Sequence, residues 1–115
     1  MFRATIAVIG SRTFTNKQLL FAMLDGFPGL FTLVSGGARG ADSFAEVYAK
    51  IHDIPIKVFK PDWDRHGKAA GFIRNKLIID EADHVVACWD GISKGTKHGI
   101  DLANKAGVPV QIIWD

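Results

Sequence analysis

Five short apolar runs rich in β-branched residues alternate with four longer helical segments along this chain of 115 residues. The runs occupy residues 5–9, 32–34, 56–59, 84–88 and 110–113. They are nearly continuous in apolar residues, which is typical of strands buried on both faces of a parallel sheet. The alternation predicts an α/β fold: a Rossmann-like three-layer α/β/α sandwich with right-handed crossovers. We expect five parallel strands in the order 3-2-1-4-5.

The helical segments carry recognisable start and stop signals. Thr15 and Gln18 form a capping box at the start of the first helix. The fourth helix is predicted to begin near Thr96 and to end at Gly107, with Pro109 just beyond. The first three helices carry apolar stripes at helical spacing: Leu20, Leu24 and Phe27; Ala41, Phe44, Ala45 and Tyr48; and Ala70, Ile73 and Leu77.

Composition predicts one folded domain over residues 1–115. Hydrophobic residues make up 48% of the chain and charged residues 23%, a balance that excludes disorder and coiled coils. No run approaches the roughly 18 apolar residues of a membrane span, and no signal-peptide pattern opens the sequence. We therefore expect a cytoplasmic protein without a membrane partner. The net charge of +2 suits an anionic ligand but falls short of the basic surface of a duplex-DNA binder.

The residues that bind metals are too few and too dispersed to predict a metal site. Cys88, the single cysteine, lies within an apolar run, where a free Cys acts as a small hydrophobe; a catalytic thiolate is the less favoured alternative. His66 and His98 are isolated in the sequence. We predict neither a metal nor a cofactor.

Three glycine-rich segments follow predicted strands, so they meet at one edge of the sheet, where α/β proteins bind ligands. They are Gly10-Ser11-Arg12, the segment Ser35-Gly36-Gly37-Ala38-Arg39-Gly40-Ala41-Asp42, and Ser93-Lys94-Gly95-Thr96. Glycine permits close backbone approach to a ligand, and the N–H groups at a helix start attract phosphate. Ordinary tight turns use the same residues, but three such loops at one edge favour a phosphate site.

A second group of candidates follows the third strand. Trp63 is placed to stack on a base, although a Trp after a strand is as often a packing residue. Arg74 lies four residues after Ala70 and four before Ile78, on the helix stripe that faces the sheet. A guanidinium there needs a partner, and a ligand phosphate would bind it bidentately. The alternative is an internal ion pair with one of three aspartates, Asp42, Asp62 or Asp90.

Two common nucleotide motifs are missing from the sequence. It contains no G-x-x-x-x-G-K-[ST], which argues against a P-loop NTPase. The first strand is not followed by G-x-G-x-x-G, and the second ends in Ser35 rather than an acidic residue, which disfavours a standard dehydrogenase.

Beside the three glycine-rich segments stand three residue pairs, Asp62-Trp63, Ala70-Gly71 and Arg74-Asn75. Together these motifs resemble the YspA-like (cpYpsA-related) family of the SLOG superfamily over nearly the whole chain. The superfamily joins the Lonely Guy phosphoribohydrolases to the DNA-processing protein A family. The resemblance implies a Rossmann-like domain that binds a small nucleotide or a nucleotide-derived ligand such as ADP-ribose, NAD or a nucleoside phosphate. The predicted ligand-binding residues are Gly10, Ser11, Arg12, Ser35, Gly36, Gly37, Arg39, Gly40, Asp42, Trp63, Arg74, Asn75, Ser93, Gly95 and Thr96. Trp89 is an alternative to Trp63 as the cover of the base.

Similarity to the Lonely Guy enzymes implies an alternative function, cleavage of the N-glycosidic bond of a nucleoside 5′-monophosphate. Arg74 is similar to their catalytic arginine, and Gly95-Thr96 to their Gly-Thr pair, but their glutamate falls on Gly99 here. Such cleavage requires a carboxylate. If the protein is an enzyme, Arg74 would orient the substrate and Asp90 is the tentative catalytic acid or base; the other carboxylates considered are Asp42, Asp62 and Asp101.

Similarity to DNA-processing protein A implies a third function, single-stranded DNA binding. The segment from Ser35 to Asp42 is close to a motif of that family. Binding a strand requires a long basic groove with stacking aromatic side chains, and a short one is available from Arg12, Arg39, Trp63, Arg65 and Lys68. We also predict a homodimer, formed through part of the apolar surface of the first helix: Leu19, Phe21, Met23, Phe27 and Phe31.

Overall fold

The computed structural model describes residues 3–114. Five strands, β1 (Ala4–Gly10), β2 (Phe31–Ser35), β3 (Ile56–Val58), β4 (His84–Trp89) and β5 (Val110–Trp114), form one sheet. Between them lie the helices α1 (Lys17–Asp25), α2 (Ala41–His52), α4 (Ala70–Glu81) and α5 (Lys94–Ala106). The short α3 (Trp63–His66) and the 3-10 turn η1 (Gly67–Ala69) precede α4.

The sheet has the order β3-β2-β1-β4-β5 with every pair of neighbours parallel, as the sequence predicts. Strand β1 is central: Val8 is in register with Ser35 on one side and with Val86 on the other. Between β1 and β4 the strand order reverses. At this switch point the loops that follow the two strands separate, which leaves a crevice beyond their carboxyl ends.

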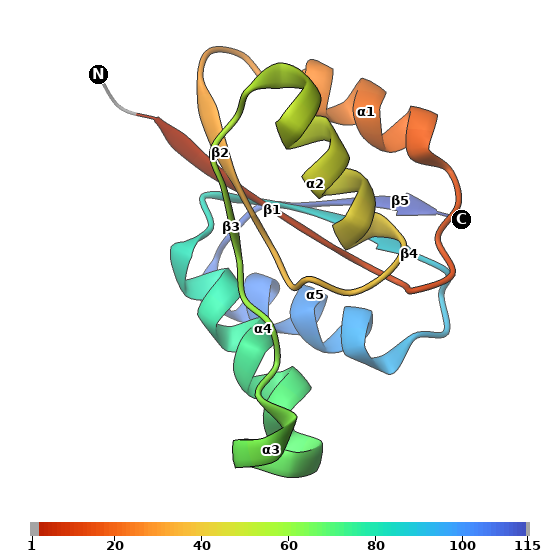
Figure 1. Cartoon of the computed structure of the whole chain (residues 1–115), viewed down its shortest axis with the longest axis vertical. Helices are drawn as coiled ribbons and strands as arrows, with labels where there is room; N and C mark the ends of the chain where they lie inside the picture. Colours follow the sequence, from red (N-terminus) through yellow and green to blue (C-terminus); the bar gives the residue numbers. More distant parts are fainter. Residues whose placement is uncertain (1–2, 115) are drawn as a thin grey trace.

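The helices cover the sheet in two layers, α1 and α2 on one face and α4 and α5 on the other (Figure 1). Each layer encloses its own apolar core. The first contains Ile6, Val8, Leu20, Leu24 and Leu33, and the second contains Ala7, Val34, Ile78, Val85 and Ala103. Because side chains alternate between the two faces of a strand, β1 supplies both cores and is the rigid centre of the molecule.

Two helix starts differ from the sequence prediction. Asn16, not Thr15, caps α1: its Oδ1 accepts a hydrogen bond from the Leu19 N–H at 3.2 Å, which leaves the predicted capping box unformed. Helix α5 begins at Lys94, two residues before the predicted Thr96, and ends as expected at Gly107 in the left-handed conformation. The apolar stripe of α2 is confirmed, with Ala41, Ala45 and Tyr48 buried.

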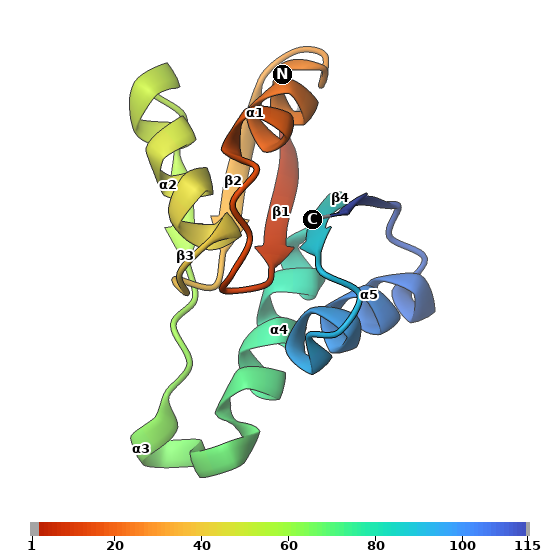
Figure 2. The same ribbon diagram turned by 90° about the vertical axis from the view of Figure 1, so that its right-hand side faces the viewer.

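The apolar stripe that we predicted for α4 is wrong at Ile73 and Leu77 and right at Ala70, and Ile78, predicted with Arg74 on the side that faces the sheet, is buried. Ile73 and Leu77 are exposed, and the buried positions of the helix are Ala70, Asn75, Ile78 and Ile79. The short helix α3 was not predicted either. It projects away from the sheet with α4 (Figure 2), and all four of its residues are exposed. Asp62 caps it by accepting from the Arg65 N–H at 3.2 Å.

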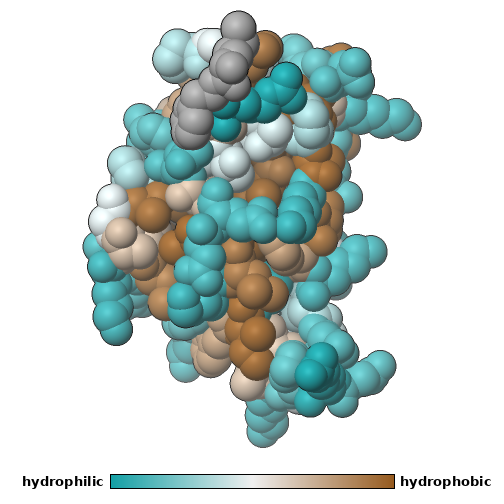
Figure 3. Space-filling model, turned by 90° about the vertical axis from the view of Figure 1, so that its left-hand side faces the viewer, coloured by the Kyte–Doolittle hydropathy of each residue, from teal (hydrophilic) through white to brown (hydrophobic). Residues whose placement is uncertain are grey.

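The apolar surface around α1 is smaller than expected. Phe31 is 8% exposed and belongs to the core, and the half-buried Phe21 packs edge-on against Tyr48. Leu19, Met23 and Phe27 line a groove of about 550 Å³. Figure 3 views the side on which the strands begin, where apolar side chains gather in the middle of the face.

None of the helices described in residues 3–114 is both long and apolar enough to cross a membrane.

Candidate functional site

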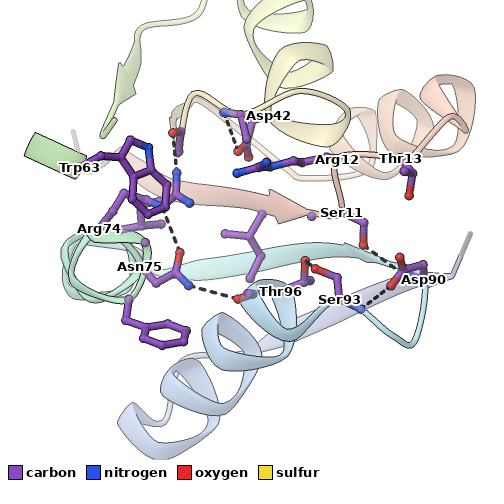
Figure 4. Close-up of a pocket in the computed structure, with 18 of the residues that line it drawn as sticks. Ser11, Arg12, Thr13, Asp42, Trp63, Arg74, Asn75, Asp90, Ser93 and Thr96 are labelled. Atoms are coloured by element: carbon purple, nitrogen blue, oxygen red, sulfur yellow. Dashed lines mark hydrogen bonds between the residues drawn. The ribbon is translucent and has the colours of Figure 1, made fainter. Parts of the chain in front are cut away.

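A cavity of about 500 Å³ opens at the carboxyl edge of the sheet, at the switch point between β1 and β4 (Figure 4). Its walls come from the loops after β1, β2 and β4, from Trp63 in α3, and from α4 and the start of α5. Polar and charged side chains dominate the lining: Ser11, Arg12, Thr13, Asp42, Lys68, Arg74, Asn75, Asp90, Ser93 and Thr96.

Glycine is required where the loops pack against one another. A Cβ on Gly10 would stand 2.6 Å from the Ala41 Cβ and 2.7 Å from the Cys88 carbonyl oxygen. Gly40 has a φ of +72°, and a Cβ there would stand 2.5 Å from the Ser11 carbonyl oxygen. Both glycines thus hold the loop after β1 against the start of α2, and Arg12 and Asp42 line the same cavity.

Arg74 and Asn75 link α4 to the loops on both sides of the cavity. Arg74 Nη1 donates to the Gly36 carbonyl oxygen at 2.5 Å, and its Nε donates to Asn75 Oδ1 at 3.1 Å. Asn75 Nδ2 donates to the Gly95 carbonyl oxygen at 3.1 Å. Within residues 3–114, Arg74 forms no ion pair shorter than 4 Å with a carboxylate, so the predicted internal ion pair to Asp42, Asp62 or Asp90 is not formed.

Two guanidinium groups and one buried carboxyl group share this wall of the cavity. Burial lowers the pKa of Arg74; Asp42 counteracts this, and the nearby Arg12 adds to it. Asp42 is 4% exposed, and its Oδ2 accepts from the Ala38 N–H at 3.1 Å. Its Oδ1 is buried and has no hydrogen-bond partner in the described chain. Burial raises the pKa of Asp42 to about 6, although the Ala38 hydrogen bond and Arg74 favour the carboxylate.

The loop after β4 is shaped by Asp90. Its Oδ1 accepts from the backbone N–H groups of Ile92 at 2.8 Å and Ser93 at 2.7 Å, and these hydrogen bonds lower the pKa of Asp90. The loop leads into α5, where the hydroxyl groups of Ser93 and Thr96 lie 3.2 Å apart. In residues 3–114 no side chain caps α5, so the N–H groups of its first turn have no capping partner there, and Gly95 and Thr96 of this turn line the cavity.

A second, smaller chamber of about 390 Å³ adjoins the first. The two chambers share five lining residues, namely Arg12, Gly36, Ala38, Trp63 and Arg74. The second chamber adds four more: Gly37, Arg39, Lys60 and Pro61. Trp63 is half exposed and stands at the boundary between the two chambers.

The structure brings most of the predicted ligand-binding residues together, and three take other places. Ser35 and Gly40 line neither chamber: Ser35 is fully buried at the end of β2, and Gly40 serves loop packing. Trp89 lies outside both chambers as well, where it donates from Nε1 to the Ser93 carbonyl oxygen at 3.0 Å and stacks on Trp114. Sequence reasoning did not assign the lining residues Thr13, Lys60 and Phe72 to the site; only the position of Lys60 directly after the apolar run 56–59 gave a signal.

The four carboxylates considered for catalysis differ in what they contact. Asp101 pairs with Lys97 at 2.8 Å on the exposed side of α5, Asp62 caps α3, and Asp90 holds its loop. Asp42 alone of these four has a buried carboxyl oxygen without a partner in the described chain. At position 99, where a glutamate would be expected by resemblance, a Cβ would stand 2.7 Å from Ile9 Cδ1, so the end of the Ile9 side chain would have to turn away. Residues 3–114 contain no cluster of three metal-binding side chains.

The parallel sheet and the polar cavity at its switch point define a Rossmann-like α/β protein. A family model for the YspA, cpYpsA-related SLOG family matches residues 4–66. The chain belongs to this family. The match contains the loops after β1 and β2 and ends before Arg74 and the start of α5.

Known proteins similar to the chain include a phage protein and two solved structures. The Gene 61 protein of Mycobacterium phage D29 is 34% identical, over 91% of this chain and 92% of that protein. DNA processing protein A (DprA) of Streptococcus pneumoniae matches with a TM-score of 0.83 and 19% identity, over 98% of this chain and 51% of that one. DNA processing protein A of Helicobacter pylori, described for its single-stranded DNA binding mode, matches with a TM-score of 0.68 and 24% identity, over 95% of this chain and 64% of that one. The chain thus spans about half the length of the pneumococcal protein, and both likenesses concern the fold.

Proposed function

We propose that residues 1–115 act as one domain that binds a small nucleotide or a nucleotide-derived ligand in the cavity at the carboxyl edge. A phosphate group would lie between Arg12, Arg74 and the first turn of α5, with the Ser93 and Thr96 hydroxyls as further donors. Trp63 at the mouth would stack on the base. The volume of about 500 Å³ suits a ligand of nucleotide size.

The observation that carries this proposal is the pairing of Arg12 and Arg74. Both line the cavity, and neither forms an ion pair within the described residues. Besides burial, the nearby Arg12 lowers the pKa of Arg74, and two such positive charges side by side are unfavourable unless an anion joins them. A phosphate group supplies that anion and accepts several charge-assisted hydrogen bonds at once.

The test uses Arg12→Gln, because Arg12 is exposed and its removal leaves the Arg74 hydrogen bonds intact. We expect calorimetric titration with a panel of nucleoside monophosphates, ADP-ribose and NAD to show binding to the natural protein. Arg12→Gln should weaken it by about tenfold or more, the equivalent of one charge-assisted contact. Arg3→Gln, an exposed arginine at the start of the chain, is the control and should bind normally. Unchanged affinity in Arg12→Gln would refute the proposed phosphate position.

The buried Asp42 Oδ1, which has no partner in the described chain, favours a second candidate function. This function is N-glycosidic cleavage of a nucleoside 5′-monophosphate. In this reaction water attacks C1′ of the ribose while the C1′–N bond breaks, and the products are ribose 5-phosphate and the free base. The Asp42 carboxyl group would transfer the proton, and Arg74 would hold the phosphate. The free base is directly visible in the NMR spectrum of a nucleoside monophosphate that is incubated with the protein. Its absence at long incubation would eliminate this function and leave binding untouched.

A third candidate, single-stranded nucleic acid binding, draws on the likeness to the DNA processing protein A of Helicobacter pylori, whose structure is described for its single-stranded DNA binding mode. The two adjoining chambers and the half-exposed Trp63 offer this chain a short groove of the kind that stacks bases. Affinity for a short oligonucleotide should then fall steeply with added salt. Salt-independent or undetectable binding would exclude it.

We also propose a homodimer through the groove of Leu19, Met23 and Phe27 on α1. A charged residue in this groove opposes burial, so Leu19→Glu should convert the dimer to a monomer in light scattering at micromolar concentration. A monomeric mass of the natural chain would refute the dimer.

A further inference from the structure

The second chamber is lined by cations without acidic partners. Four of its nine lining residues carry a positive charge, Arg12, Arg39, Lys60 and Arg74, and none of the nine is Asp or Glu. A cleft lined by one sign of charge concentrates the field in its interior and attracts counter-ions of the opposite sign. The chamber is therefore suited to an anion and would repel a cation.

Positive charge is distributed unevenly over the molecule. The chain has 14 Lys and Arg against 12 Asp and Glu. Within residues 3–114, Lys57, Lys76 and Lys97 each pair with a carboxylate at 2.8 Å, and all three lie outside the two chambers. Arg39 and Lys60 have no such partner in the same residues. The second chamber thus gathers cations that no ion pair occupies.

Two glycines line the second chamber, and neighbouring side chains pack closely on both. Gly37 has a φ of +73°, and a Cβ there would stand 2.8 Å from Val58 Cγ1 and 3.0 Å from Lys60 Cγ. A Cβ on Gly36 would meet the Arg74 guanidinium, whose Nη1 donates to the Gly36 carbonyl oxygen. The two glycines thus bring the charged groups of Lys60 and Arg74 close to the backbone that lines the chamber.

We propose that the chamber of Arg39 and Lys60 is a second phosphate subsite, so that the ligand carries two phosphate groups on either side of Trp63 and Arg74. This inference rests on the proposed function, which places the first phosphate between Arg12, Arg74 and α5. Two phosphates flank the nucleoside in an internal unit of a single strand, and two are joined directly in a nucleoside diphosphate. The subsite is the same in both cases, and the ligand series below distinguishes them.

The first experiment follows backbone amides by ¹⁵N NMR during titration with inorganic phosphate, at constant ionic strength maintained with chloride. We expect two separate groups of amides to shift, one at Ser11–Thr13 and Gly95–Thr96 and the other at Gly37–Arg39 and Lys60. The double variant Arg39→Gln, Lys60→Gln should lose the second group and keep the first. Glutamine retains the Cβ and Cγ atoms that pack on Gly37 and removes only the charge.

The matched control is the double variant Lys50→Gln, Lys105→Gln, which removes the same charge from exposed lysines in the last turns of α2 and α5, at the opposite edge of the sheet. It should keep both groups of shifts. If only the first group moves in the natural protein, the second subsite does not exist. If neither moves, the proposed function also fails, and if only the second moves, the first phosphate position alone is wrong.

The second experiment joins the two positions in one ligand. For the four common bases, we compare nucleoside 5′-monophosphates with 3′,5′-bisphosphates and with 5′-diphosphates by calorimetry. A second charge-assisted contact should raise affinity by about tenfold or more, and the double variant should lose this gain. A gain for the bisphosphates identifies a strand-like ligand, and a gain for the diphosphates identifies a free nucleotide. No gain in either series overturns the proposal that one ligand spans both chambers.

Discussion

Helices α2 and α4 have the same length of 12 residues and pack on opposite faces of the same sheet, yet they are held in different ways. Helix α2 is positioned by its core: Ala41, Ala45, Tyr48 and Ala49 are buried, and Asp42 is the polar exception. Helix α4 buries fewer apolar side chains and is joined to two loops through Arg74 and Asn75.

The difference shows what fixes each helix. Apolar burial is non-directional, so α2 is fixed by shape and volume. The contacts of α4 to the Gly36 and Gly95 carbonyl oxygens are directional, and they tie the helix to the loops that form the cavity. Substitutions in α2 should therefore change the free energy of unfolding, whereas substitutions in the polar stripe of α4 should change the cavity.

The largest effect is expected for Arg74→Ala. It removes the guanidinium from the cavity and breaks the hydrogen bond to Gly36. Affinity for a phosphate-bearing ligand should fall by about 30-fold to 1000-fold, the equivalent of roughly 2–4 kcal/mol. Calorimetric titration of the folded protein measures this loss, with the melting temperature recorded in parallel. A variant that melts earlier but binds with natural affinity would assign Arg74 a purely structural role.

Asp42→Asn tests the one polar side chain among the buried residues of α2. The folded-state pKa of about 6 exceeds the ordinary 3.8, so between these values the native protein binds more protons than the unfolded chain. The contribution of Asp42 to the free energy of unfolding is therefore fully present below about pH 4 and is lost as the pH rises through 6. The loss amounts to about 3 kcal/mol in total. Asparagine carries no charge and still accepts from the Ala38 N–H, so the variant should be more stable than the natural protein at pH 7.5 by up to this amount.

Urea denaturation at a series of pH values checks this expectation. The stability of the natural protein should decline between pH 4 and 6, and that of Asp42→Asn should decline less over the same range. Asp80→Asn, on the exposed side of α4, is the control and should reproduce the natural profile. Parallel profiles for the natural protein and Asp42→Asn would show that Asp42 does not bear the raised pKa.

Ala45→Leu tests the apolar contact of α2. Ala45 is completely buried in the first core, and added methylene groups force their neighbours apart at a cost of about 1–3 kcal/mol. The midpoint of urea denaturation should fall, while ligand affinity of the folded protein stays unchanged. An equal loss of affinity would show that the position of α2 controls the cavity after all.

The smallest effect is expected for Leu77→Gln in α4. Leu77 is 47% exposed although it lies on the stripe that the sequence predicts to be buried. Surface substitutions of this kind change the free energy of unfolding by about 0.5 kcal/mol or less. A loss of 2 kcal/mol or more, in the range of a buried leucine, would mean that α4 turns its predicted stripe inward in solution.

The sequence predicted what depends on apolar periodicity and missed what depends on polar contacts between distant segments. The five strands and the helices α2 and α5 follow from continuous apolar runs and from glycine at a helix end. The face of α4 that carries Ala70, Arg74 and Ile78 was predicted to meet the sheet, but the burial of Asn75 was not, because its hydrogen bond goes to a loop 20 residues away. The role of Lys60 depends on its approach to Gly37, and the open oxygen of Asp42 depends on how the loops close around it. No local pattern contains such information.

The close packing of Gly99 on Ile9 also constrains how this protein can change. A glutamate at position 99 would require the δ-methyl group of Ile9 to turn away, because that group lies 2.7 Å from the position of the new Cβ. Ile9 belongs to the second core, so the displaced methyl group must find room among its neighbours there. An engineer who wishes to install a glutamate at position 99 must therefore check the packing of Ile9 together with the new side chain.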